Sequence, residues 1–229
     1  MVLLLIAIGL TPAFKMKFWN IGAEGQILVG GAATAALMIY AGDSMPTPVL
    51  MILMFVASLA AGMIWGIIPA IFKAYFNTNE TLFTLMLNYV AMQIVTFCIV
   101  YWENPAGSNT VGIINSATRA GWLPALGGLT YGWNVLIVLA FTFGMYIYMK
   151  YSKQGYEVAV VGESQDTARY ARINVKRTII RTMGISGGIC GIAGFLLSAV
   201  PAIRFQHPRQ ADAALQLSSL RGYQNSMHL

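Results

Sequence analysis

Charged residues are scarce in this chain. Asp, Glu, Lys and Arg make up 10% of its 229 residues, whereas hydrophobic residues make up 57%. A soluble domain carries about 25% charged residues, which cover its water-facing surface. The composition therefore excludes an ordinary soluble globular domain. It favours one helical bundle dissolved in lipid.

Metal-binding and redox residues are also sparse. Cys98 and Cys190 are the only cysteines and lie in apolar stretches, while His207 and His228 lie in a polar tail. Their spacing fits neither a zinc site nor a disulfide framework. No GxxxxGK[ST] phosphate loop, HExxH or GxSxG motif occurs. We therefore expect no metal, no cofactor and no enzymatic activity, so that any ATP hydrolysis belongs to a partner.

Six apolar stretches are suited to crossing a membrane. A spanning helix needs about 20 mostly apolar residues; the first stretch is shorter, and together they are 1–14, 24–41, 48–72, 82–101, 133–150 and 178–200. Strands are not expected, because an open sheet edge in lipid leaves backbone groups unpaired. The predicted fold is an all-α polytopic transmembrane bundle of about six segments. It occupies residues 1–203, and a polar tail of uncertain structure follows at 204–229.

Basic residues are distributed unevenly between the predicted connections. Ten lie in or beside every second connection: Lys15, Lys17, Lys73, Lys150, Lys153, Arg169, Arg172, Lys176, Arg177 and Arg181. The alternate connections, 42–47 and 102–132, contain only Arg119. Lys and Arg accumulate on the cytoplasmic side of membrane proteins, so loop 151–177 is predicted to be cytoplasmic and loop 102–132 external. This pattern accounts for the net charge of +6 without nucleic acid binding.

Small residues recur at every fourth position in two spans. The three series are Ser58, Gly62 and Gly66; Gly184 and Gly188; and Gly187 and Gly191. Small faces let helix backbones approach closely in a membrane. The spacing predicts tight helix packing, with flexing during transport as the less favoured interpretation.

Polar residues open the second span. Asn20, Glu24 and Gln26 stand there with two glycines, Gly22 and Gly25. Ionisable groups at membrane depth usually face the bundle interior or water, and glycines permit a broken helix whose free amides bind polar solutes. Alternatively, Glu24 lies at the cytoplasmic interface and favours the helix N-terminus electrostatically. The residues leave both interpretations open.

The fourth span also carries polar side chains. Asn77 and Glu80 resemble a capping box before it, whereas Asn88 and Tyr89 lie well inside it. A buried amide requires a hydrogen-bond partner. Interhelical pairing satisfies that requirement, and contact with a solute is the alternative.

The predicted cytoplasmic loop contains signals for a short helix. Ser164 can cap a helix that starts at Gln165, and Arg169, Arg172 and Lys176 then fall on one face. A short exposed helix between two spans is suited to receive force from a soluble motor. A basic loop held near anionic headgroups is the alternative.

These segments together resemble the permeases of ABC importers of the ribose and branched-chain amino acid type, nucleoside branch. The similar stretches cover roughly residues 10–200 and are NIGAEGQ at 20–26, NETLFTLMLNY at 79–89, GESQDTARYARINV at 162–175 and MGISGGICGIAG at 183–194. The family's loop reads G-E-N-P-x-A-A-R-Y-A-G-I-N, and the matching positions are Gly162, Glu163, Ala168, Arg169, Tyr170, Ala171, Ile173 and Asn174. Ser164 and Gln165 replace Asn-Pro, and Arg172 replaces the glycine that commonly ends such a helix.

The resemblance implies a multi-pass subunit of the bacterial plasma (inner) membrane that moves a nucleoside or a simple sugar-like solute. Its partners would be a cytoplasmic ABC ATPase, a second permease subunit in a homo- or heterodimer, an extracytoplasmic solute-binding lipoprotein and membrane lipid, with no nucleic acid. The eight matching loop residues would couple to the ATPase. The solute path would include Asn20, Glu24, Gln26, Asn88 and Tyr89.

Two alternatives to an active importer subunit follow from the sequence. The first span is short, charge bias places the N-terminus outside, and the resemblance stops near Val200, so we expect the chain to be incomplete as a transporter. A truncated, inactive permease fragment is therefore one alternative. An ion-coupled transporter is less favoured, because it needs an acidic residue in mid-span, whereas Glu24 and Glu80 fall at span starts.

Overall fold

The computed structural model describes residues 1–42, 44–103, 110–112, 114–115, 121–123, 132–199 and 205–206. Its helices are α1 (Val2–Lys15), α2 (Ala23–Ala41), α3 (Thr47–Phe76), α4 (Glu80–Tyr101), α5 (Gly132–Tyr151), α6 (Lys153–Glu163), α7 (Gln165–Tyr170) and α8 (Val175–Ser198). Two short strands, β1 (Thr110–Gly112) and β2 (Phe205–Gln206), form an antiparallel pair. Each of the six predicted spans corresponds to one of these helices among the described residues.

Four of the described helices are long and apolar enough to cross a membrane: α3, α4, α5 and α8. Helix α2 has 19 residues, but Glu24 and Gln26 in its first turns make it less apolar. Helix α1 has 14 residues and is shorter than a full span. The expected all-helical polytopic membrane bundle is therefore confirmed.

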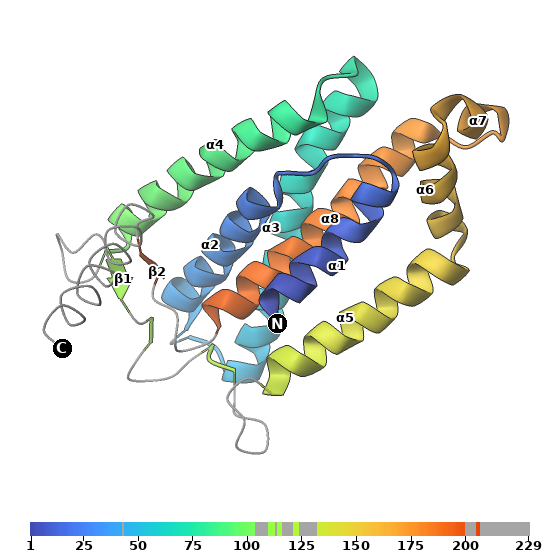
Figure 1. Cartoon of the computed structure of the whole chain (residues 1–229). Coiled ribbons are helices and arrows are strands. Elements are labelled where there is room, and N and C mark those ends of the chain that lie inside the picture. The colour runs from blue at the N-terminus through green and yellow to red at the C-terminus, as the bar shows by residue number, and fades with distance from the viewer. Residues whose placement is uncertain are drawn as a thin grey trace, which may run out of the picture.

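Helix α8 is the centre of the bundle. It packs against α1, α2 and α3, while α4 lies outside α2 and α5 lies outside α1 (Figure 1). In α8, 83% of the most apolar window is buried, compared with 28% or less in the other three long spans. The glycine-rich sequence of α8 thus belongs to the helix with the most helical neighbours.

Glycines set the separation of α8 from α2 and α3. A Cβ added to Gly62 of α3 would lie 2.6 Å from the Cα of Gly191, and a Cβ on Gly30 of α2 would lie 2.6 Å from the Gly191 carbonyl oxygen. Side chains at these positions would therefore force the helices apart. The predicted close packing of the small residues is confirmed for Gly62, Gly187 and Gly191, whereas Gly188 makes only ordinary contacts.

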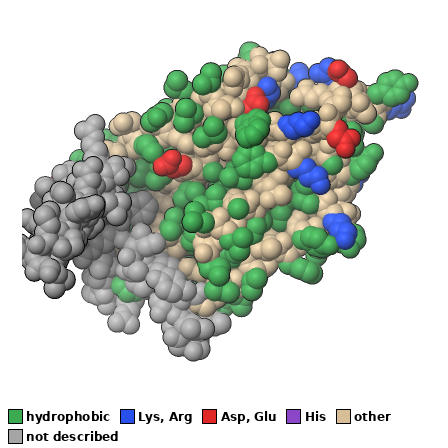
Figure 2. Space-filling view, viewed as in Figure 1, with side chains coloured by type: hydrophobic (Ala, Val, Ile, Leu, Met, Phe, Trp, Pro, Cys, Tyr) green, Lys and Arg blue, Asp and Glu red, His purple; other side chains and the backbone are tan. Residues whose placement is uncertain are grey.

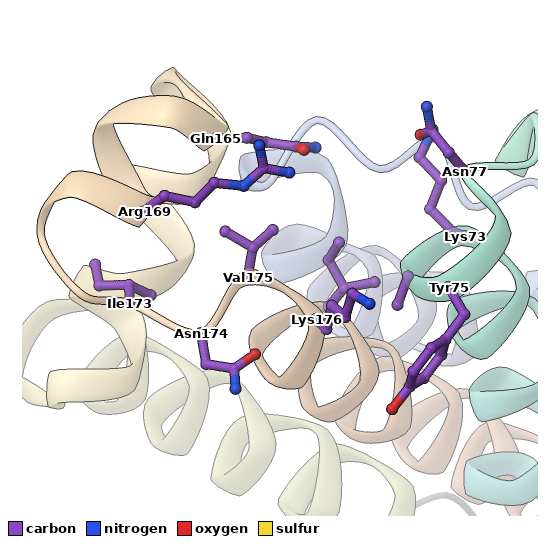
Figure 3. Close-up of a pocket in the computed structure, with 11 residues that line it drawn as sticks. Lys73, Tyr75, Asn77, Gln165, Arg169, Ile173, Asn174, Val175 and Lys176 are labelled. Atoms are coloured by element: carbon purple, nitrogen blue, oxygen red, sulfur yellow. The ribbon is translucent and has the colours of Figure 1, made fainter.

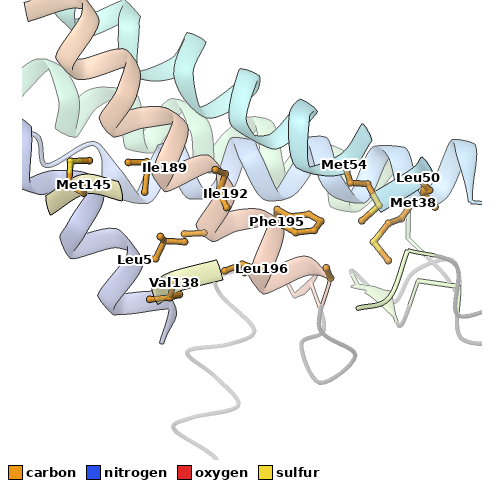
Figure 4. Packing of buried hydrophobic residues seen from close by; sticks show 12 residues of the cluster. Leu5, Met38, Leu50, Met54, Val138, Met145, Ile189, Ile192, Phe195 and Leu196 are labelled. Atoms are coloured by element: carbon orange, nitrogen blue, oxygen red, sulfur yellow. The ribbon is translucent and has the colours of Figure 1, made fainter. Parts of the chain in front are cut away.

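The largest apolar cluster fills the half of the bundle that contains the N-terminus of α1. It joins Leu5, Met38, Leu50, Ile192 and Phe195 from four helices (Figure 4). Phe55 and Phe195 meet edge to face with ring centroids 5.8 Å apart. These contacts fix α1, α2 and α3 around the C-terminal half of α8.

The two ends of the bundle differ in chemistry. The connections α1–α2, α3–α4 and α5–α8, the last containing α6 and α7, lie at one end (Figure 1), where Lys and Arg side chains gather (Figure 2). We call this the basic end. The two short strands lie at the opposite end, although no strands were expected. Most of loop 102–132 and of the tail 204–229 falls outside the described residues.

Candidate solute path and coupling surface

Helix α2 begins at a depth within the bundle, and not at the end of the bundle where α4 begins. The backbone N–H of Gly25, in the first turn of α2, donates to Asn88 Oδ1 at 2.9 Å. Asn88 is eight residues beyond Glu80, the first residue of α4, which corresponds to about 12 Å along a helix. Non-helical backbone at such depth requires protein partners for its polar groups.

Asn88 provides those partners. Besides accepting from Gly25, its Nδ2 donates to the Ile21 carbonyl oxygen at 2.9 Å, and only 4% of the residue is exposed. One amide thus satisfies one backbone donor and one backbone acceptor on either side of the α2 N-terminus. The interhelical pairing that the sequence suggested is present, and the side chain points at the α2 entry.

Two further polar residues complete this buried junction. Asn20 Oδ1 accepts from the Gly22 N–H at 3.0 Å, and Asn20 Nδ2 lies 3.5 Å from Gln26 Oε1. Both side chains are almost fully buried. We refer to Asn20, Gln26 and Asn88 as the polar junction, because together they hold the irregular backbone before α2.

The indole of Trp65 was not identified from the sequence as part of this region. Its Nε1 lies 3.1 Å from the position of a Cβ on Gly25 and has no hydrogen-bond partner among the described residues, although it is buried. A tryptophan in a long apolar run gives no local signal of this role. Only the packing of α3 against α2 brings the unpaired donor to the junction.

The other two predicted path residues are exposed. Glu24 lies on the surface of α2 in its first turn, where a carboxylate favours the helix N-terminus. Tyr89 is 59% exposed on α4. The five predicted path residues therefore divide into three buried ones that hold the backbone and two that reach the surface of this chain.

The predicted capping box between Asn77 and Glu80 is wrong. Asn77 ends α3 in the left-handed conformation, with φ of 50°, and Asn79 caps α4 by accepting from Thr81 and Leu82 N–H groups at 3.0 and 3.3 Å. Glu80 instead pairs with Lys73 at 2.8 Å. This ion pair joins the ends of α3 and α4 at the basic end.

The short helix predicted in the loop between the fifth and sixth spans is present as α7. Ser164 Oγ accepts from the Thr167 N–H at 3.3 Å, as expected for its cap. The helix ends at Tyr170, sooner than the predicted segment Glu163 to Asn174. Helix α6 precedes it and forms where the sequence pattern predicts a loop.

Arg172 ends α7 in the conformation that glycine usually adopts. Its φ is 58°; its N–H donates to the Arg169 carbonyl at 3.0 Å, and the Ile173 N–H donates to the Ala168 carbonyl at 2.9 Å. This pair of bonds is a complete Schellman motif. Arginine at the position of the family's glycine therefore still ends the helix, but in a left-handed backbone conformation that is unfavourable for a residue with a Cβ atom.

Of the eight loop residues that match the family, three are packed against the protein and five are exposed. Ala168 is fully buried, Ile173 is partly buried, and Gly162 is buried where a Cβ would overlap the Lys15 carbonyl oxygen at the end of α1. The remaining five are exposed and are Glu163, Arg169, Tyr170, Ala171 and Asn174. Tyr170 is 94% exposed. The packing residues thus hold α7 against the bundle, and Tyr170 projects from it.

The predicted basic face of Arg169, Arg172 and Lys176 does not form, because α7 ends between the first two. Arg169 and Lys176 instead line a cavity of about 440 Å³ with Lys73 (Figure 3). Lys176 Nζ also lies 4.6 Å from the centre of the Tyr75 ring. Arg172 faces a different cavity, on the other side of the α7–α8 connection.

The arrangement combines a broken helix entry inside a membrane bundle with a short exposed helix at its basic end. A model of the branched-chain amino acid transport system permease component matches residues 1–218. The chain belongs to this permease family. No solved structure matches the permease.

Several characterised relatives are nucleoside or sugar permeases. The permease is 32% identical to the guanosine ABC transporter permease protein NupP of Bacillus subtilis, over 80% of its own length and 52% of the relative's. It is 28% identical to the nucleoside ABC transporter permease protein NupB of Lactococcus lactis, over 84% and 55% of the two chains. The glucose ABC transporter permease protein TsgB13 of Haloferax volcanii is 29% identical, over 89% and 56%.

The permease spans about half the length of the curated relatives it matches. Its family and its apolar helices make it a multi-pass protein of the plasma (inner) membrane. The family resemblance found from four sequence stretches is confirmed, and two of these relatives are named for guanosine or nucleosides. Its relatives are named as permease proteins of ABC transporters.

Proposed function

We propose that the permease forms part of the membrane path of an ABC importer that moves a nucleoside or a related polyhydroxylated solute. Two of the relatives described above are named for guanosine or nucleosides and one for glucose. The partners would be a second permease subunit, a cytoplasmic ABC ATPase and an extracytoplasmic solute-binding lipoprotein. The basic end would face the cytoplasm, as the lysine and arginine distribution predicts.

The observation that carries the proposal is the projection of α7 from the basic end. A large aromatic side chain that is 94% exposed is suited to fill a pocket on another protein, because tyrosine is enriched among the residues that dominate binding energy. Ala168 of α7 is fully buried, and Gly162 of the preceding α6 packs tightly against the end of α1. A push on Tyr170 would therefore be transmitted to α1 and α8.

The path would run beside the polar junction. Asn20, Gln26 and Asn88 fix the start of α2. Trp65 Nε1 lies nearby as a buried donor without a partner among the described residues, so it could pair with a polar solute atom. Glu24 and Tyr89 would meet the solute or the second permease subunit, because a carboxylate on a membrane helix requires polar surroundings.

Tyr170→Ala tests the coupling role in the permease co-expressed with its ATPase and lipoprotein. We expect ATP-dependent guanosine uptake and retention of the ATPase during purification to fall at least tenfold, since such an anchor contributes about 2 kcal/mol or more to binding. Tyr156→Ala is the matched control, because Tyr156 is 66% exposed on the neighbouring α6. Normal uptake and normal ATPase retention in Tyr170→Ala would refute the coupling assignment.

Competition between labelled guanosine and unlabelled solutes distinguishes a nucleoside importer from a sugar importer. Excess unlabelled guanosine should abolish uptake of labelled guanosine, whereas excess glucose should not. Inhibition by glucose alone would favour a sugar importer. No ATP-dependent uptake of either solute would contradict the proposed function.

A further inference from the structure

We propose that the permease binds one anionic phospholipid at its basic end, with the headgroup between α6 and α8 and an acyl chain between α5 and α8. The inference depends on the membrane location of the bundle. It depends neither on the solute nor on the ATPase, so it can fail or succeed separately from the proposed function.

The headgroup site is a cavity of about 420 Å³ that is lined by four cations and one carboxylate. The cations are Lys153, Arg172, Arg177 and Arg181. Glu157 forms an ion pair with Arg181 at 2.9 Å, and the other three cations have no carboxylate partner among the described residues. The cavity therefore carries a formal excess of three positive charges, which attracts a phosphate group.

Arg181 links this cavity to the bundle interior. Its Nε is buried and has no hydrogen-bond partner among the described residues, although Nη2 contacts Glu157. Buried polar groups in folded proteins are normally paired. A phosphate oxygen at the floor of the cavity would give this guanidinium a second anionic partner.

An apolar groove lies further along α8, beyond Arg181. The groove lies between α5 and α8, has a volume of about 360 Å³ and includes Phe141, Gly144 and Tyr148 of α5 and Ile185 and Ile189 of α8 in its lining. Ile185 is one turn beyond Arg181, and Ile189 is two turns beyond it, so the groove extends about 12 Å from the cation. A Cβ on Gly144 would meet nothing within 4 Å, which leaves room for a hydrocarbon chain.

Exposed tyrosines place the cavity at the level of the headgroups. Tyr151 at the end of α5 is 71% exposed, and Tyr156 on α6 is 66% exposed. Tyrosine is enriched where the membrane meets water. Basic pockets between transmembrane helices at this level bind anionic headgroups. A cationic cavity above an apolar groove matches the two chemical parts of one phospholipid.

Native mass spectrometry of the detergent-purified permease provides the test. Phosphatidylglycerol should bind at least tenfold more tightly than phosphatidylcholine with the same acyl chains, and inorganic phosphate should bind more weakly than either. The double substitution Lys153→Gln, Arg177→Gln should lower phosphatidylglycerol affinity about 25-fold, or about fivefold for each cation. Both side chains are exposed, so the fold should persist, which thermal unfolding verifies.

Two further variants separate a lipid from a simple anion. Lys150→Gln removes an exposed cation outside the cavity, one that contacts the Tyr146 hydroxyl at 2.8 Å, and should change phosphatidylglycerol affinity less than twofold. Gly144→Phe fills the groove without altering charge and should lower phosphatidylglycerol affinity at least fivefold, with phosphate binding unchanged.

Several results would overturn the proposal. These are equal affinity for the two lipids, an equal loss in Lys150→Gln and the double variant, or phosphate binding as tightly as phosphatidylglycerol. A photo-reactive residue at position 144 that captures a protein helix in the membrane, and no lipid, would show that another segment occupies the groove.

Discussion

Gly191→Ala should destabilise the permease, whereas the chemically identical change Gly188→Ala should not. A Cβ on Gly191 would overlap the Ser58 carbonyl oxygen and lie 3.0 Å from the Cα of Gly62. A Cβ on Gly188 would lie 3.6 Å from the nearest atoms of Leu59, which is an ordinary contact. Both glycines lie in α8, three residues apart.

Two opposing contributions determine how much each substitution changes the free energy of unfolding. Alanine favours a helix by about 0.8–1.0 kcal/mol relative to glycine, so Gly188→Ala should be neutral or stabilise by up to that amount. At position 191 the obstacle is backbone, which no side-chain rotation can relieve, and α3 must move by about 1 Å to restore normal contact. Overpacking of this kind costs about 1–3 kcal/mol. The two variants should therefore differ by about 2 kcal/mol.

Unfolding in mixed detergent micelles, followed by far-ultraviolet circular dichroism, measures this difference. The expected order of stability is Gly188→Ala, at or above the unsubstituted permease, and then Gly191→Ala clearly below it. If the two variants differ by less than about 0.5 kcal/mol, or if Gly191→Ala is the more stable one, the assigned close contact between α3 and α8 is wrong.

Two further predictions concern the junction and the end of α7. Asn88→Leu should lower the free energy of unfolding by about 2–4 kcal/mol, because the Gly25 N–H and the Ile21 carbonyl lose their partner while buried; unchanged stability in the same unfolding assay would contradict the junction. Arg172→Gly should raise stability by about 0.5–1 kcal/mol, because it relieves a left-handed φ of 58°. Slower hydrogen exchange of the Ile173 N–H would show this, and faster exchange would contradict it.

The positions of the helices could be predicted well because hydrophobic runs determine them. The spans predicted at 82–101 and 133–150 correspond to α4 (Glu80–Tyr101) and α5 (Gly132–Tyr151). The cap at Ser164 was also predictable, since it involves neighbours three residues apart. Errors arose where two local patterns competed: both Asn77 and Asn79 precede Glu80, and the structure makes the first a helix end and the second a cap.

The roles of individual site residues were less predictable. Ala168 and Tyr170 both match the family's loop, yet one is fully buried and the other is 94% exposed. Trp65 and Gly25 are 40 residues apart, and nothing near either residue indicates that they meet. A residue's burial depends on which neighbouring helix covers it, and a single sequence does not state which helices are neighbours.

From the amino-acid sequence alone, the protein could be predicted to be a helical membrane bundle with basic connections on one side, and its transporter family could be identified by resemblance. These properties follow from composition, from runs of about 20 apolar residues and from short motifs. The central position of α8, the start of α2 inside the bundle beside Asn88, and the four cations that lie near an apolar groove are visible only in the three-dimensional packing. Such features join residues far apart in the chain, and the packing of whole helices brings them together.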